Sequence, residues 1–241
     1  MKPIWQAAPA DLEVRQDEAH VWFCNFSEVS DFADGSQVLS EAEQNRADRF
    51  KTEDSKLTYI GSHIFLRRVL GSCLPIPASA VRFSVSTGGK PCLDQLIHAT
   101  DLQFNLSHSQ RSAACIIARG TAVGIDLERS DPELCDDDTA RQVFGQEELH
   151  YLNQRGQTER TAAFFRGWTK KEAYAKCKGT GLSSDLAALT IGCHDAESVF
   201  GGVSLLSFRF PNGYAGALAI EGPSVPVSYW TMSPQRLINL T

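Results

Sequence analysis

The chain has 241 residues, with 23 Lys and Arg against 29 Asp and Glu, and a formal net charge of −6. This acidic balance argues against a nucleic-acid-binding protein, because neutralising phosphates requires a basic surface. The seven cysteines include no Cys-x-x-Cys pair, so neither a disulfide framework nor a zinc site is indicated. No apolar run is long enough to span a bilayer, and the first residues lack the apolar segment of a signal peptide. We therefore expect a cytoplasmic protein with no membrane partner.

The first third of the chain predicts one strand and two helices. Residues 20–24 form an apolar and aromatic run typical of a strand. Ser40 and Glu43 match a capping box, which predicts that a helix begins there. A second helical pattern starts at about residue 54 and ends before the prolines at 75 and 77. The helices carry arginines that are either solvated or positioned to bind phosphate: Arg46, Arg49, Arg67 and Arg68.

Two further strands are predicted in the middle of the chain, and both lead into polar residues. Residues 81–85 precede the turn Thr87-Gly88-Gly89-Lys90-Pro91, whose lysine is either a solubilising residue or a ligand contact. Residues 102–106 run into Ser107-His108-Ser109. Neighbouring side chains on a strand point to opposite faces, so these three residues do not form a catalytic triad. A hydrogen-bonding turn that meets an anion is favoured instead.

Residues 113–118 and 122–128 are two apolar runs separated by Arg119-Gly120-Thr121, a pattern that predicts a hairpin. In the second run, alternation directs Ile125 and Leu127 into the core. It places Asp126 and Glu128 together on the opposite face. Two neighbouring carboxylates repel each other unless a cation or hydrogen-bond donors compensate. This face is therefore either solvated or a site for a hard divalent cation.

Residues 164–176 predict a helix on which Trp168, Glu172 and Lys176 recur at intervals of four. Taken alone, the Glu172 and Lys176 pair is typical of a solvated surface ion pair. If the apolar side of this helix packs on the strand with Asp126 and Glu128, the three carboxylates could converge on one Mg²⁺. Such a set of ligands is typical of phosphoryl transfer. Trp168 is then expected to anchor the helix by packing.

Beyond this helix, Gly179-Thr180-Gly181 predicts a helix C-cap and turn. Four apolar or alternating runs follow and predict strands at residues 186–191, 203–208, 214–220 and 227–230.

The chain carries four motifs in order: Gly89-Lys90-Pro91, Phe104-Asn105-Leu106-Ser107-His108-Ser109, Gly124-Ile125-Asp126-Leu127-Glu128 and Trp168-Thr169-Lys170-Lys171-Glu172-Ala173-Tyr174-Ala175-Lys176. Together they resemble the signature of the Sfp-type 4′-phosphopantetheinyl transferases, the holo-acyl/peptidyl-carrier-protein synthase superfamily. Each motif alone is weak, but four in order are specific. The segments 49–67 and Gly179-Thr180-Gly181-Leu182 extend the resemblance to about residues 40–192.

The resemblance implies transfer of the 4′-phosphopantetheine arm of coenzyme A (CoA) to a serine of an apo acyl or peptidyl carrier protein, with release of 3′,5′-ADP. It also implies an α+β fold with pseudo-two-fold duplicated α/β halves. Each half would be a small, mostly antiparallel sheet with packed helices, and the active site would lie at their interface. We expect the halves at residues 1–121, with the CoA nucleotide contacts, and 122–241, with the metal-binding carboxylates. The layout resembles the monomeric branch of the superfamily.

Carried over to this sequence, the resemblance assigns Asp126, Glu128 and Glu172 to Mg²⁺, with Glu172 also the candidate base. Lys176 would lie along the CoA diphosphate and stabilise charge on the leaving side. The other expected CoA contacts are Lys90 and Pro91 at the adenine, Ser107 and His108 at the nucleotide phosphates, Arg46 at the 3′-phosphate, and Arg67; His108 is also a catalytic candidate. Glu148 resembles a further family element, with little expectation of a catalytic role.

Two alternatives keep the same ligands but differ in chemistry. The first is a non-catalytic CoA-binding or carrier-docking protein of the same fold. The second is a Mg²⁺-dependent phosphohydrolase. The presence of all three carboxylates together with Lys176 favours catalysis of transfer over binding alone.

Overall fold

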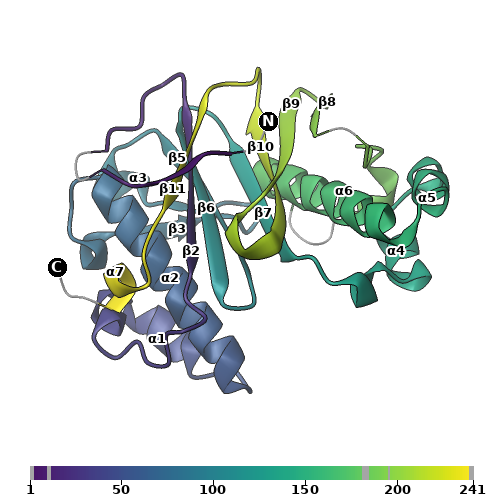
Figure 1. The fold of residues 1–241 in the computed structure, drawn as a ribbon. Helices are drawn as coiled ribbons and strands as arrows, with labels where there is room; N and C mark the ends of the chain where they lie inside the picture. Colours follow the sequence, from purple (N-terminus) through teal and green to yellow (C-terminus); the bar gives the residue numbers. More distant parts are fainter. Residues whose placement is uncertain (1–2, 10–11, 181–184, 195, 239–241) are drawn as a thin grey trace.

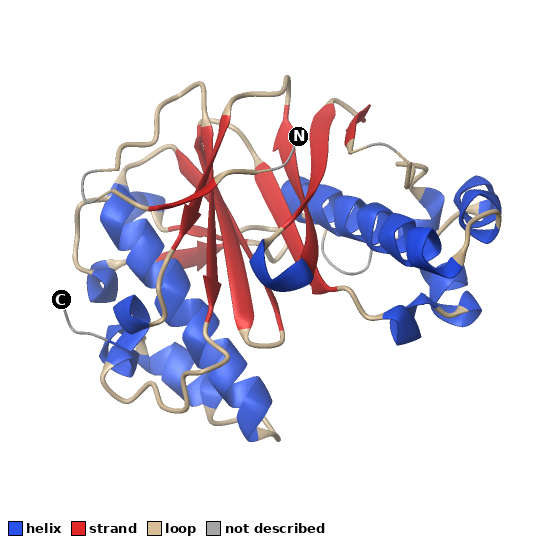
Figure 2. Cartoon of the chain, in the orientation of Figure 1, coloured by secondary structure: helices blue, strands red, loops and turns tan. Residues whose placement is uncertain are grey.

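The computed structural model describes residues 3–9, 12–180, 185–194 and 196–238. Within these residues the protein has an α+β fold with two larger sheets and a small hairpin (Figures 1 and 2). The first sheet has the order β1 (Trp5–Ala7), β11 (Val227–Thr231), β2 (Ala19–Asn25), β6 (Ser112–Arg119), β5 (Leu102–Ser109). The second has the order β7 (Val123–Arg129), β10 (Tyr214–Glu221), β9 (Val203–Arg209), β8 (Glu197–Phe200). The hairpin pairs β3 (Phe83–Val85) with β4 (Pro91–Leu93).

Each larger sheet is covered on one face by a long helix (Figure 1). Helix α2 (Glu53–Cys73) packs on the first sheet with α1 (Glu41–Ala47) beside it, and α6 (Gln157–Lys178) packs on the second. The shorter helices are α3 (Gln95–His98), α4 (Asp137–Val143), α5 (Gln146–Asn153) and α7 (Gln235–Ile238). Among the residues described, no helix is long and apolar enough to cross a membrane.

The predicted capping box at the start of α1 is confirmed. Ser40 Oγ accepts from the backbone N–H of Glu43 at 3.3 Å, and the backbone N–H of Ser40 donates to Glu43 Oε2 at 2.7 Å. Thr52 caps α2 in the same way, accepting from the N–H of Ser55. The inner face of α2 is fully buried against the first sheet through Ile64, Phe65, Val69 and Leu70. Both helices therefore begin where the capping residues place them.

The second face of each sheet is buried against the other sheet. On β2, Trp22 belongs to the core beneath α2, whereas Val21 belongs to the core between the sheets. On β7, Ile125 and Leu127 are completely buried in the same inter-sheet core, as alternation predicted. The opposite side of the second sheet packs on α6, with Ala217 of β10 in that core. The layers are thus helix, sheet, sheet, helix, and the predicted fold class is confirmed.

The hairpin expected at residues 113–128 is wrong, although both of its strands exist. β6 pairs with β2 and β5, and β7 pairs with β10. The turn at Gly120 therefore carries the chain from one sheet to the other. Apolar periodicity identified each strand correctly, but both faces of each strand are buried, so the pattern held no information about its partner.

The strand expected at residues 186–191 is also wrong. Leu186–Ala188 forms a short 3₁₀ turn, and the carboxylate of Asp185 caps it by accepting from the N–H of Ala188. The strands predicted at 203–208, 214–220 and 227–230 are confirmed as β9, β10 and β11. Gly179 ends α6 at φ 67°, as the C-cap prediction requires, whereas Gly181 and Leu182 lie outside the described residues.

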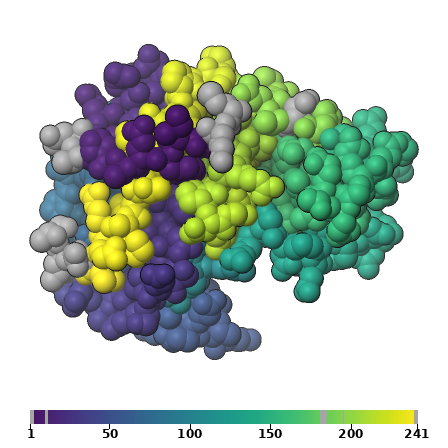
Figure 3. Space-filling view, in the orientation of Figure 1, coloured from purple at the N-terminus to yellow at the C-terminus, as the bar shows by residue number. Residues whose placement is uncertain are grey.

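The strand β11 crosses back to the first sheet, where it runs parallel to both β1 and β2. Figure 3 shows the consequence on the surface, where the yellow segment near the C-terminus lies against the purple segment near the N-terminus. The second half of the chain therefore supplies one strand and the helix α7 to the first half. For the elements other than β11 and α7, the division of the chain into two halves between residues 121 and 122 stays a proposal.

We expect Gly124→Ala to destabilise the protein by about 1–3 kcal/mol, because an added methyl group would overpack the contact between β7 and α6. A Cβ at Gly124 would lie 2.0 Å from the carbonyl oxygen of Ala173 and 2.6 Å from the backbone nitrogen of Cys177. Urea unfolding measures the change. For comparison, a Cβ at Gly156, the N-cap of α6, would meet nothing within 4 Å, so Gly156→Ala should cost only the weaker N-cap. A Gly124→Ala protein as stable as the wild type would contradict this packing.

Candidate functional site

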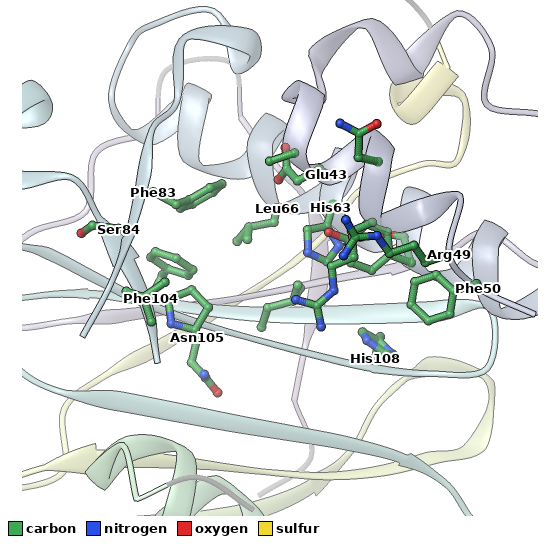
Figure 4. Close-up of a pocket in the computed structure, with 17 residues that line it drawn as sticks. Glu43, Arg49, Phe50, His63, Leu66, Phe83, Ser84, Phe104, Asn105 and His108 are labelled. Atoms are coloured by element: carbon green, nitrogen blue, oxygen red, sulfur yellow. The ribbon is translucent and has the colours of Figure 1, made fainter. Parts of the chain in front are cut away.

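A cleft of about 1240 Å³ opens between the α1 and α2 helices and the strands β3 to β5. Figure 4 shows Arg49, Phe50 and His63 on its helical side, with Phe104 and His108 on the strand side. Its lining combines aromatic rings with cationic groups. A cleft of this composition suits a planar, anionic ligand, because rings stack on rings and guanidinium groups bind phosphate.

The cations of the cleft come from the short helix α1 and the segment that follows it. Arg46 and Arg49 are both exposed, and both line the cleft. The Arg46 guanidinium lies over the ring of Tyr59, 5.7 Å from its centroid. Phe50 packs against the same ring at 5.3 Å between centroids. The guanidinium groups are thus presented beside an aromatic surface.

Two residues of the cleft were missed by the sequence analysis. Tyr59 and His63 lie one turn apart on α2, and their rings stack with centroids 3.8 Å apart. His63 Nδ1 lies 2.9 Å from the carbonyl oxygen of Tyr59, which places the proton on Nδ1 in the neutral ring. Burial, with the nearby His108 and Arg46 adding to it, lowers the pKa of His63 to about 4. The spacing of four between Tyr59 and His63 is visible in the sequence. These residues lie beside the apolar stripe by which the helix was identified, so they were not distinguished as a possible site.

The structure does not support the expected contact of Arg67 with CoA. Arg67 is 2% exposed, and its guanidinium forms a salt bridge with Glu43 at 2.8 Å. It also donates to the carbonyl oxygens of Ala78 and Val81. Arg67 therefore ties α1 and the loop after α2 to the core. Its position near the cleft is structural, and the cleft's charge comes from Arg46 and Arg49.

The two sheets meet where β5 and β7 lie side by side, and we call this contact the seam. It is made by side chains of β5 and backbone groups of β7. Asn105 Oδ1 accepts from the N–H of Ile125 at 2.9 Å, and Ser107 Oγ accepts from the N–H of Leu127 at 3.3 Å. A third bond, from the N–H of Arg129 to Ser109 Oγ, has a length of 3.2 Å. The partner numbers rise together, so the two strands run in the same direction.

The carboxylates predicted as metal ligands lie at this seam. Asp126 is 2% exposed, and its Oδ1 accepts from Ser107 Oγ at 3.0 Å and from Lys176 Nζ at 2.6 Å. Its Oδ2 is buried without a hydrogen-bond partner. Ser109 Oγ donates to Glu128 Oε2 at 2.9 Å. Ser107 is therefore turned toward the carboxylates, and the cleft is lined by its neighbour His108.

Burial and mutual repulsion raise the pKa of two of the carboxyl groups at the seam, those of Glu128 and Glu172. Burial, followed by the charge of Asp126, raises the pKa of Glu128 to about 7. The same two causes raise the pKa of Glu172 above its ordinary value, while Lys176 opposes them. On the cleft side, loss of hydration and the positive charge of Lys176 lower the pKa of His108. The helix α6 thus brings Glu172 and Lys176 to the strand with Asp126 and Glu128, as the sequence analysis predicted.

The donor set fits a hard divalent cation in chemistry. Carboxylate oxygens are the ligands that Mg²⁺ prefers, and the unpartnered Oδ2 of Asp126 is a buried acceptor that a cation would satisfy. In the described part of the chain, however, no three His, Cys, Asp or Glu side chains are gathered closely enough to hold a metal ion. In this structure the positive charge at Asp126 is supplied by Lys176.

The turn with Lys90 and Pro91 borders both the cleft and α6. Pro91 lines the cleft, whereas Lys90 Nζ donates to the carbonyl oxygen of Val123 at 2.7 Å. Burial lowers the pKa of Lys90. A Cβ at Gly88 would lie 2.2 Å from the carbonyl oxygen of Gly179, so the turn sits directly on the end of α6. Lys90 therefore links the hairpin to β7.

A buried ion pair beneath the site was not predicted. Lys171 and Glu148 are 0% and 3% exposed, and Lys171 Nζ donates to the Glu148 carboxylate. The same ammonium donates to the carbonyl oxygens of Val143 and Leu186, at 2.8 and 3.0 Å. Glu148 also accepts from the N–H of Gly192 at 2.9 Å. These bonds hold α4, α5 and the 3₁₀ turn against α6, which accounts for Glu148 without a catalytic role.

Trp168 takes the packing role expected of it. Its ring lies 5.4 Å from that of Phe164 and 6.2 Å from that of Phe165, between centroids. This packing holds α6 against the core that it shares with α4 and α5.

Comparison with known proteins gives two matches that together span most of the chain. Residues 26–119 match the family described as 4′-phosphopantetheinyl transferase, N-terminal. Residues 122–216 match the 4′-phosphopantetheinyl transferase superfamily. The boundary between the two matches falls at the turn that joins β6 to β7.

Individual relatives carry the same description. The chain is 33% identical over 184 residues to the 4′-phosphopantetheinyl transferase HetI of Nostoc sp., covering 76% of this chain and 78% of the relative. It is 27% identical over 208 residues to the 4′-phosphopantetheinyl transferase Sfp of Bacillus subtilis, covering 83% and 90%. The enzyme gsp of Aneurinibacillus migulanus is 30% identical over 164 residues, covering 68% and 65%.

We expect the stability lost by the protein on acidification to depend on His63. Its pKa of about 4 lies below the ordinary value of 6.5, so the folded state binds fewer protons than the unfolded chain between these values. Stability is therefore lost as the pH falls through this window. Urea unfolding near pH 7 and near pH 4 should show that His63→Asn loses less than the wild type, by on the order of 2 kcal/mol. Parallel losses in the two proteins would rule out this burial of His63.

Proposed function

Because the chain belongs to the 4′-phosphopantetheinyl transferase family, we propose that it transfers the 4′-phosphopantetheine arm of CoA to a serine of an apo acyl or peptidyl carrier protein, releasing 3′,5′-ADP. The observation that carries this proposal is the placement of the cationic, aromatic cleft directly beside the carboxylates of the seam. A nucleotide in the cleft would have its diphosphate within reach of Lys176 and the acidic side chains. We propose a monomeric enzyme, since one chain contains both halves of the site. We also propose that the enzyme is cytoplasmic, as the sequence analysis expects.

The residues divide the chemistry between them. Asp126, Glu128 and Glu172 would hold Mg²⁺, which when bound supplies positive charge to the diphosphate oxygens. Glu172 would accept the proton of the attacking serine. Lys176 would stabilise the charge that develops on the leaving 3′,5′-ADP. Each role follows from where α6 meets the seam.

The nucleotide would be held by the other half of the chain. Arg46 and Arg49, which line the cleft, would bind the 3′-phosphate, and Pro91 would border the adenine. His108 reaches into the cleft beside Lys176 and would contact a phosphate. Lys90 would act on the adenine side by holding its turn against β7.

Intact-mass measurement of an apo carrier after incubation with CoA, Mg²⁺ and the protein tests the reaction. Pantetheinylated carrier supports transfer. Unmodified carrier with intact CoA would indicate binding alone, and unmodified carrier with degraded CoA would indicate hydrolysis. Excess EDTA is expected to abolish the mass increase, and transfer that continues at the same rate in EDTA would contradict the role of the metal.

We expect Glu172→Ala to lower kcat/KM for CoA by about two orders of magnitude or more, because one change removes a metal ligand and the proposed base. Carrier modification by the purified variant is the measurement. Glu159→Ala is the matched control, since Glu159 is an exposed carboxylate on the same helix with only a 3.9 Å contact to Arg166. A Glu172→Ala variant as active as this control would be incompatible with the assignment.

We expect Arg46→Gln to raise the KM for CoA about tenfold or more, because a hydrogen bond to a charged phosphate is lost. Dephospho-CoA lacks the 3′-phosphate, so its KM should be unchanged by the same substitution. Arg141→Gln is the control, since Arg141 is an exposed arginine on α4 in the other half. An equal rise in KM for both substrates would show that Arg46 does not bind the 3′-phosphate.

A further inference from the structure

We propose that Ser109 is a positioning residue that holds the carboxylate of Glu128 in the orientation needed to bind the cation. This inference rests on the proposed function, because it concerns the metal that the transfer requires. Its basis is the hydrogen bonding of one hydroxyl group at the seam. Ser109 Oγ lies 2.9 Å from Glu128 Oε2 and 3.2 Å from the backbone nitrogen of Arg129.

The direction of these two bonds is determined by their chemistry. A backbone N–H can only donate, so Ser109 Oγ accepts from Arg129. A serine hydroxyl has a single proton, and the Glu128 oxygen is the acceptor within reach. The proton is therefore aimed at the carboxylate by a bond that the backbone itself fixes. If the hydroxyl rotated away from Glu128, the hydrogen bond to the carboxylate would be lost.

The same arrangement occurs two residues earlier on the strand. Ser107 Oγ donates to Asp126 Oδ1 and accepts from the N–H of Leu127. In both cases the carboxylate is 19 residues further along the chain and the N–H is 20 residues further. Since two residues is the period of a strand, the repeat follows from β5 and β7 running side by side in register. Each metal carboxylate of β7 thus receives a hydroxyl from β5.

Glu128 depends on this bond more than Asp126 does. The carboxylate of Asp126 is also held by Lys176 at 2.6 Å. Glu128 is half-buried beside two other carboxylates that repel it, and Ser109 is its hydrogen-bond donor in the described residues. A glutamate has three rotatable side-chain bonds, so an unrestrained Glu128 would turn away from its neighbours. The Ser109 hydroxyl opposes that movement before any cation arrives.

Direct titration with Mn²⁺, used in place of Mg²⁺ and followed by the electron paramagnetic resonance of the free ion, measures this role without turnover. We expect Ser109→Ala to weaken Mn²⁺ binding about 10-fold or more, as is typical when a partner of a metal ligand is removed. Ser109→Thr keeps the hydroxyl and should restore the affinity. In steady state, Ser109→Ala should raise the Mg²⁺ concentration for half-maximal rate, while kcat at saturating Mg²⁺ stays close to wild type.

The matched control is Ser112→Ala, which removes the serine directly opposite Ser109 across β5 and β6. Its hydroxyl accepts from Asn25 Nδ2 at 2.8 Å and, in the part of the chain that the structure describes, forms no hydrogen bond with a carboxylate. Ser109→Cys, with a weak donor of similar size, replaces the alanine variant should that one fail to fold, and weakened binding is again expected. Unchanged Mn²⁺ affinity in a folded Ser109→Ala or Ser109→Cys protein would overturn the proposal, as would equal weakening in Ser112→Ala.

One outcome separates this inference from the proposed function. If the wild type modifies carriers and binds Mn²⁺ but the Ser109 variants bind it equally well, only the positioning role is wrong. If the wild type shows no saturable Mn²⁺ binding and transfers normally in EDTA, the proposed requirement for a metal is wrong. The positioning role of Ser109 is then wrong as well.

Discussion

The edge strands β5 and β7 meet through side chains of one strand and backbone groups of the other. Two edges placed together would ordinarily complete a continuous backbone ladder, but here the hydrogen bonds to Ile125, Leu127 and Arg129 come from Asn105, Ser107 and Ser109. These side-chain bonds replace a backbone ladder, and Asp126 lies beside the join on the face of β7 that packs on α6. Buried N–H groups must be satisfied, so the polar residues of β5 are required for the sheets to join at all. The acidic site exists because the two sheets do not merge.

The position of the charges follows from this join. The protein is acidic overall, with a net charge of −6, yet its two functional regions have opposite signs. Arg46 and Arg49 make the outer cleft cationic, while Asp126, Glu128 and Glu172 make the seam acidic. Lys176 lies between them and already neutralises Asp126. A cationic cleft beside an acidic seam matches an anionic substrate bound together with a divalent cation better than it matches the anion or the cation alone.

Much of the acidic site could be predicted from the sequence because each part of it has a short period. Alternation placed Asp126 with Glu128, and helical spacing placed Glu172 with Lys176. The contacts of Arg67 could not be predicted, since its burial depends on a loop that returns eleven and fourteen residues later. The partners of the strands could not be predicted for a similar reason. The partner of β7 is β10, which lies far along the chain. Both faces of β7 are buried, so its sequence lacks the alternation of apolar and polar residues that marks a strand with one exposed face.

The strand β11 lies between β1 and β2, yet it is the last strand among the described residues. During synthesis, β2 must therefore keep one edge unpaired until residues 227–231 leave the ribosome, and β1 has no strand partner among the described residues other than β11. Non-local pairing of this kind slows folding, and an open edge invites pairing with other chains in the meantime. The first sheet consequently cannot be completed before the second half of the chain has been made.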